Sequence, residues 1–271
     1  VRNPESFWEE IAEEHFEWNK RWDKVLDWDF SKPEIKWFEG AKLNITINCI
    51  DRHLRTKGDK TAILFEHNDP RKPAEHITYK QLHERVCKMA NVLKDKGVVK
   101  GDRVCIYLPM IPELAIAVLA CARIGAVHSV VFAGFSSTAL STRINDCDAK
   151  MVITSDGSYR GAKTIDLKGI VDEAMEDCPN VESVLVVKHI ASDIEMKDNR
   201  DYWLAPLLKE AYADCDPEIM DAEDPLFILY TSGSTGMRKG MLHTTAGYMV
   251  YTAYTFKNVF QYKDNDVYWC T

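Results

Sequence analysis

The sequence predicts an α/β protein in which a mostly parallel sheet is flanked by helices. From about residue 59 onward, short apolar runs rich in Val, Ile and Leu alternate with segments of helical periodicity. This alternation is typical of parallel sheets built from right-handed strand–helix–strand units. The apolar runs are continuous, with no polar residue at every second position, as expected of strands covered on both faces.

The first helix of this region is the most clearly marked. After a predicted strand at residues 61–66, Thr78 and Gln81 have the spacing of an N-terminal capping box. Gly97 is a natural C-terminal stop. Apolar residues recur between them at three- and four-residue spacing, so one face of a helix over 77–97 is predicted to be buried.

The same criteria predict the remaining elements in order. The sequence 112–125 is apolar nearly all round, as in a helix pressed on a sheet, and Ser136 is a helix N-cap candidate. We expect helices at 112–125, 136–147 and 167–176, and strands at 102–108, 126–132, 149–156, 181–188, 225–230 and 266–271.

The first 58 residues have a different composition and are rich in Trp and Phe. An aromatic stripe can stack on sugars or bases, but burial alone explains its periodicity. We therefore expect a helix clamped onto the larger body, with a boundary between residues 58 and 59. Its predicted face consists of Trp8, Ile11, His15, Trp18 and Trp22.

Composition limits the classes of function. Lys and Arg number 34 against 42 Asp and Glu, a net charge of −8, which disfavours general nucleic-acid binding. The longest apolar segment, 111–132, is broken by charged residues and proline, so we expect no membrane span. The 8 cysteines are scattered without zinc or disulfide spacing, which favours reduced thiols in a cytoplasmic protein.

One segment, YTSGSTGMRKG at 230–240, points to chemistry. A strand delivers it to the carboxyl edge of the sheet, where α/β folds bind ligands. Its glycines allow backbone amides to approach an anion, its hydroxyls can donate to phosphate oxygens, and a following helix N-terminus is expected to favour negative charge. The candidate phosphate-binding residues are Thr231, Ser232, Gly233, Ser234, Thr235, Gly236 and Lys239.

Three other interpretations of this segment fit its residues less well. It lacks the G-x-x-x-x-G-K-[ST] pattern of a Walker A loop and the G-x-G-x-x-G pattern of dinucleotide folds. A flexible polar turn explains one Ser-Gly pair but hardly the whole string.

The segment resembles the signature loop of the adenylate-forming superfamily of acyl-CoA synthetases, adenylation domains and luciferases. Flanking strings such as IAVLACARIGAVHSVVFAGFSSTAL and HTTAGYMVYTAYTFKNVF resemble the acetyl-coenzyme A synthetases (acetate–CoA ligases). The resemblance covers nearly the whole chain and implies an N-terminal cap at 1–58 and the first part of an AMP-binding domain at 59–271. Family members are well over twice this length, so the chain is expected to be a fragment, inactive alone.

The resemblance implies a two-step reaction with ATP, CoA and acetate as small-molecule substrates. A carboxylate and ATP form an acyl-adenylate and pyrophosphate, and the CoA thiol then displaces AMP. The candidate loop matches the family's ATP-phosphate loop, and Mg²⁺ is expected with ATP at a site beyond residue 271, along with the acyl pocket and the catalytic lysine. The sequence therefore assigns no catalytic and no metal-binding residue.

The resemblance also implies a CoA site. The family's Arg-x-x-Arg/Lys pattern maps onto Arg160 and Lys163, which enclose Gly161 and Ala162. Phe132 and Gly134 correspond to residues beside the CoA adenine, although Ala133 stands where relatives often have glycine. Taken without the resemblance, Arg160 and Lys163 read as solvated surface charge.

The chain also departs from the family pattern within the candidate phosphate loop. Met237 and Arg238 stand where relatives usually have Lys-Pro, and losing proline is expected to make the loop more mobile. A ligase for propionate or another short acid, a non-catalytic nucleotide- or CoA-binding homologue, and an assembly unit remain alternatives.

Overall fold

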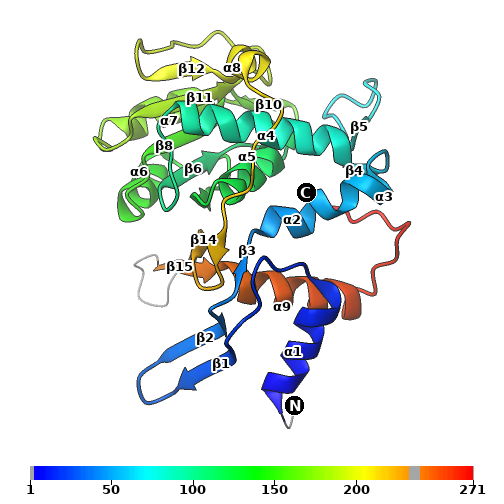
Figure 1. Cartoon of the computed structure of the whole chain (residues 1–271). Coiled ribbons are helices and arrows are strands. Elements are labelled where there is room, and N and C mark those ends of the chain that lie inside the picture. The colour runs from blue at the N-terminus through cyan, green and yellow to red at the C-terminus, as the bar shows by residue number, and fades with distance from the viewer. Residues whose placement is uncertain (1–2, 232–238, 271) are drawn as a thin grey trace.

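The computed structural model describes residues 3–231 and 239–270. Figure 1 shows a sheet covered by helices in the upper part of the molecule, and below it a region that contains α1 (Pro4–His15), α9 (Thr245–Asn258) and the hairpin of β1 (Lys24–Asp29) and β2 (Glu34–Glu39). The predicted α/β class, with a mostly parallel sheet flanked by helices, is confirmed.

The main sheet has seven strands within the described residues, in the order β12-β11-β8-β6-β7-β14-β15. Neighbouring strands run parallel from β12 to β14, and only β15 is antiparallel. Because β7 and β14 share one register pair, Phe227 with His128, the last two strands are joined to the rest by a narrow connection. The strands are β6 (Arg103–Tyr107), β7 (Val127–Val130), β8 (Met151–Ser155), β11 (Ser183–Val187), β12 (Asp201–Trp203), β14 (Pro225–Thr231) and β15 (Lys239–Thr244).

Two hydrophobic cores lie on the two faces of this sheet. Along β6, Val104 and Ile106 pack into one core with α4 and α5, while Cys105 and Tyr107 pack into the other with α6 and α7. This alternation is the period of two that a strand imposes on its side chains. The helices are α1 (Pro4–His15), α2 (Ile45–Cys49), α3 (Leu54–Lys57), α4 (Tyr79–Asp95), α5 (Pro112–Arg123), α6 (Ser137–Asp146), α7 (Leu167–Met175), α8 (Leu204–Glu210) and α9 (Thr245–Asn258), with a 3-10 turn at Asp51–His53.

Short two-stranded sheets complete the fold. The pairs are β1 (Lys24–Asp29) with β2 (Glu34–Glu39), β3 (Lys42–Leu43) with β13 (Met220–Asp221), β4 (Thr61–Phe65) with β5 (Glu75–Thr78), and β9 (Ser158–Arg160) with β10 (Lys163–Ile165).

Several predicted details are confirmed. Thr78 and Gln81 form the capping box of α4, and Gly97 after this helix has a φ of +83°. The Ser136 side chain accepts from the Ala139 amide at the start of α6. All 8 cysteines lie among the described residues and are free thiols, and burial raises the pKa of Cys121 to about 12.

The N-terminal aromatic face was predicted wrongly in one respect. The helix ends at His15, and Phe16 is extended, so Trp18 and Trp22 lie outside it. The reason is tertiary: the amides of residues 19 and 20 both donate to the Lys42 carbonyl, which reverses the chain. Trp18 and Trp22 still pack on Phe38, at ring distances of 5.4 and 5.1 Å. The expected clamp is confirmed, because Trp8 of α1 contacts Tyr254 of α9 at 5.4 Å.

Three expectations near the C-terminal side are also wrong. The segment after 232–238 is a strand, β15, and α9 begins only at Thr245, because residues 239–244 pair with β14. β14 is not covered on both faces, since Leu229 is 49% exposed. Residues 266–270 form no strand, because they are exposed and pair with no strand in the described part of the chain.

Within residues 3–231 and 239–270, no helix has the length and apolar character needed to cross a membrane.

Candidate functional site

The predicted site residues follow strands that lie side by side. β8, β6, β7 and β14 are neighbours and run parallel, so the segments that leave their carboxyl ends meet at one edge of the sheet. The hairpin β9–β10 follows β8, the loop 131–136 follows β7, and the segment 232–238 follows β14. This is the edge at which α/β proteins bind ligands.

The two ends of the candidate phosphate loop lie opposite each other. Thr231, the last residue of β14, is the register partner of Lys239, the first residue of β15, and both are exposed. A hydroxyl and an ammonium group therefore flank the base of the segment that connects the two strands. The other loop candidates, Ser232, Gly233, Ser234, Thr235 and Gly236, lie outside the described residues, as do Met237 and Arg238.

The helix N-terminus expected to favour anions here is absent from this position. The six-residue strand β15, which begins with Lys239 itself, precedes α9, so the α9 dipole does not begin at the loop. Among the described residues at the base of this segment, the Lys239 ammonium and the Thr231 hydroxyl are the groups that can support a phosphate.

Arg160 and Lys163 are brought together by a tight hairpin. They are register partners across β9 and β10, joined by the turn residues Gly161, at a φ of +60°, and Ala162. Direct partners on an antiparallel ribbon point to the same face, where two like charges repel each other. In the described part of the chain neither has a carboxylate partner, and both are exposed. An anion bound between them would relieve this repulsion.

Phe132 and Gly134 lie beside this hairpin. Phe132 is 67% exposed at the turn that follows β7, and its ring lies 5.7 Å from that of Phe135. Gly134 has a φ of +115°, and a Cβ placed there would lie 3.7 Å from the Ile165 side chain of β10. The loop 131–136 and the basic hairpin are therefore in contact, although Gly134 and Ile165 are 31 positions apart in the sequence (165 − 134).

Two residues that the sequence analysis missed connect these loops. The Arg143 guanidinium of α6 lies over the rings of Phe135 and Tyr230, at 4.8 and 5.5 Å. It thereby links the loop after β7 to the strand that leads into 232–238. Burial, then the hydrogen bond to Asp146 at 2.6 Å, raises the pKa of the Tyr230 hydroxyl, so Tyr230 stays neutral.

The other missed residue is Tyr107, which is fully buried at the end of β6. Its hydroxyl donates to the Phe135 carbonyl at 2.7 Å and accepts from the Gly134 amide at 3.0 Å. No local pattern reveals Arg143 or Tyr107, because their partners are distant in sequence. A buried Tyr at the end of a strand, which needs a partner for its hydroxyl, is the one available hint.

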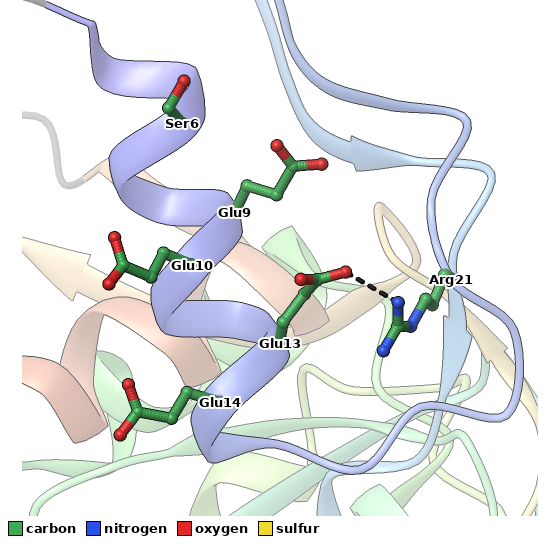
Figure 2. A pocket seen from close by; sticks show the side chains of 6 residues that line it. All are labelled: Ser6, Glu9, Glu10, Glu13, Glu14 and Arg21. Carbon is green, nitrogen blue, oxygen red and sulfur yellow. Dashed lines mark hydrogen bonds and ion pairs between the residues drawn. The ribbon is translucent and has the colours of Figure 1, made fainter.

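Two hollows of the surface differ from the sheet edge in the charge of the residues that line them. One, of about 500 Å³, lies along α1 and carries four glutamates, with Arg21 paired to Glu13 at 2.7 Å (Figure 2). Its carboxylates would repel a nucleotide. A second, of about 240 Å³, is mainly apolar and lies between α5, β7, β14 and α9. Among the described residues, no group of three or more His, Cys, Asp or Glu side chains could hold a metal ion.

Comparison with known families and structures gives consistent matches. The model of the AMP-binding enzyme family matches residues 50–271, and that of the acetyl-coenzyme A synthetase N-terminus matches residues 1–49. The acetyl-coenzyme A synthetase of Halorhodospira halophila is 56% identical over the whole chain, and acetyl-coenzyme A synthetase 2 of Pseudomonas aeruginosa is also 56% identical. In both cases the chain spans 42% of the relative's length.

A solved structure shares the fold. The acetoacetyl-CoA synthetase of Streptomyces lividans superimposes with a TM-score of 0.86 at 27% identity, over 95% of this chain and 39% of that one.

Proposed function

Since the chain belongs to the AMP-binding enzyme family, we propose that it is the N-terminal part of an acetate–CoA ligase. In the first step ATP and acetate form acetyl-AMP and pyrophosphate, and in the second the CoA thiol attacks acetyl-AMP to form acetyl-CoA and AMP. The names of the relatives support acetate as the acid. Because the chain spans 42% of their length, the activity is proposed for the complete protein. In this proposal residues 1–58 are the cap and 59–271 the first part of the adenylation domain.

The observation that supports the proposal is that two candidate anion-binding elements lie at one sheet edge. The Thr231–Lys239 pair flanks the segment 232–238 after β14, and the Arg160–Lys163 pair lies on the hairpin after β8, with β6 and β7 between these two strands. ATP and CoA are both polyanions, and a ligase of this kind must bind both.

Each element has a distinct proposed role. The residues Thr231, Ser232, Gly233, Ser234, Thr235, Gly236 and Lys239 bind the ATP phosphates and stabilise the charge that develops on pyrophosphate as it leaves. Arg160 and Lys163, with the turn residues Gly161 and Ala162, bind the phosphates of CoA, since a guanidinium can hold a phosphate through two hydrogen bonds. Phe132 and Gly134 border its adenine.

The environment of the proposed enzyme follows from charge and composition. A net charge of −8 suits small-molecule substrates and a cytoplasmic enzyme that binds no nucleic acid or membrane. Mg²⁺ accompanies ATP, and no described residue is assigned to it. The other partner is the remainder of the enzyme's own chain.

The test separates the two steps in the full-length protein. Acetate-dependent exchange between ATP and pyrophosphate reports the first step without CoA, and acetyl-CoA formation reports both. We expect Lys239→Ala to reduce exchange about 10- to 100-fold, the loss of one charged hydrogen bond. Arg160→Ala should raise the KM for CoA by a similar factor and leave exchange unchanged. Lys72→Ala, which removes an exposed cation between β4 and β5, is the matched control.

The outcomes distinguish the alternatives. A full-length protein without exchange on any short acid would leave a non-catalytic binding homologue, and stronger exchange with propionate than with acetate would change the substrate. An Arg160→Ala variant that weakens exchange as much as acetyl-CoA formation would remove the assignment of the CoA site.

A further inference from the structure

A buried hydroxyl in the core of the sheet has a placement that packing does not explain. Tyr107 is 0% exposed and lies in the core between the sheet, α6 and α7. A phenylalanine would fill the same space, and a buried hydroxyl is costly unless it is hydrogen-bonded. Both of its hydrogen bonds go to one loop, to the Phe135 carbonyl and from the Gly134 amide. Burial raises the pKa of this hydroxyl, so it remains a donor.

The loop that Tyr107 holds has an unusual shape. Phe135 donates its amide to the Phe132 carbonyl at 3.1 Å, which closes a tight turn, and Gly134 within it has a φ of +115°. This turn leaves Phe132 67% exposed. Such a turn has little internal stabilisation, so the hydrogen bonds from Tyr107 at the end of β6 should reduce its motion.

The held loop faces the proposed CoA site. Gly134 approaches Ile165 of β10, and Ala133 and Ile165 pack against the same core cluster as Tyr107. The Arg160–Lys163 pair lies on the same hairpin as Ile165. The position of the exposed Phe132 ring relative to Arg160 and Lys163 is therefore fixed only while the loop keeps its turn.

We propose that Tyr107 is a positioning residue that holds the loop 131–136 in the shape that receives the adenine end of CoA. This inference rests on the proposed function and deepens its CoA site. Tyr107 itself does not touch the ligand, because it is completely buried. It acts through the Gly134 amide and the Phe135 carbonyl.

The test uses the full-length enzyme with Tyr107→Phe, which keeps the ring and removes both hydrogen bonds. We expect the KM for CoA to rise about tenfold, the effect of one or two lost hydrogen bonds. Exchange between ATP and pyrophosphate should remain unchanged, and amide hydrogen exchange at Gly134 should become faster. Tyr202→Phe is the matched control, since its hydroxyl donates to the Asn199 carbonyl, at the far edge strand β12.

A second variant reaches the same loop without changing the core. Gly134→Val places a branched side chain at a φ of +115° and should raise the KM for CoA together with faster amide hydrogen exchange at Phe135. Because Gly134 borders the proposed adenine site, a raised KM without faster exchange would indicate a steric block and contradict the inference. It keeps the inference testable should Tyr107→Phe fail to fold.

The outcomes separate this inference from the proposed function. A wild-type enzyme that forms no acetyl-CoA contradicts the proposed function itself. An active wild type with an unchanged KM for CoA in both variants refutes the positioning role alone. Equal losses in exchange and in CoA use, or an equal effect of Tyr202→Phe, would show a general structural effect and also refute it.

Discussion

We expect Asp201→Ala to destabilise the protein strongly, because it breaks a buried ion network. Lys168 and Asp201 have side chains that are 1% and 0% exposed, and their charged atoms lie 2.8 Å apart. Lys168 also contacts Asp172 at 2.6 Å, and Arg200 pairs with both carboxylates. The network therefore holds two cations and two carboxylates.

The magnitude follows from what the substitution leaves behind. Without Asp201, two cations share one carboxylate. Arg200 is 19% exposed and can reach water, but Lys168 cannot. Lys168 keeps its contact with Asp172, but the cluster then has one excess positive charge, and removing one partner of a buried ion pair costs about 3–5 kcal/mol of unfolding free energy. Replacing the ion pair by apolar side chains, as in Lys168→Met with Asp201→Leu, should recover much of this loss.

The assay is urea unfolding of the full-length protein and its variants. Glu84→Ala, which breaks a more exposed ion pair with Lys88, is the control and should cost less than about 1 kcal/mol. A cost below about 1 kcal/mol for Asp201→Ala, or a double variant no more stable than the single one, would refute the reasoning.

The same network predicts a pH dependence. Burial alone would raise the pKa of Asp201, but hydrogen bonds from Arg200 and Lys168 outweigh it and hold the pKa below its usual range. The unfolded chain then takes up this proton first as the pH falls. The stabilisation is therefore complete above about pH 4, the ordinary Asp value, and is lost as the pH drops through the folded value.

Three further predictions concern single residues. Burial lowers the pKa of His128 to about 4, so its NMR signal should show a neutral ring down to pH 5, and a midpoint above 6 in the folded protein would contradict this. In the unfolded chain the pKa of His128 is about 6.5, so the unfolded state is protonated first as the pH falls. The free energy of unfolding should therefore decrease by about 3 kcal/mol between pH 6.5 and pH 4, and His128→Leu should remove this pH dependence. Asp156→Asn should lower the free energy of unfolding by about 2–4 kcal/mol, because the buried carboxylate accepts hydrogen bonds from three backbone amides at 2.7–3.1 Å. The control Asp193→Asn, at an exposed nearby residue, should leave it nearly unchanged in the same urea assay. Thr78→Ala should cost about 1 kcal/mol through the lost helix cap, and an unchanged urea midpoint would count against it.

The helices and strands were predictable where local chemistry and burial agree. The capping box of Thr78 and Gln81, the serine cap of α6 and the continuous apolar strands all depend on residues close together in sequence. The errors occurred where a distant segment decides the outcome. Trp18 and Trp22 have helical spacing, but the helix ends before them, where the amides of residues 19 and 20 donate to the Lys42 carbonyl.

The candidate site shows the same division. The loop residues, the Arg160–Lys163 pattern and the candidates Phe132 and Gly134 were identified from motifs in sequence. Their common edge, and the replacement of the expected helix by the strand β15 after the loop, depend on strand order and pairing. Periodicity did not distinguish a helix from a strand across so short a segment.

The sequence by itself determined the α/β class, most element positions and the family, because propensity, caps and motifs are local properties of the chain. Only the tertiary structure decided that the Thr231–Lys239 and Arg160–Lys163 pairs share one sheet edge and that Arg143 and Tyr107 connect the loops there. These relations depend on which strands become neighbours, and that choice is made by long-range packing and hydrogen bonding between residues far apart in the chain.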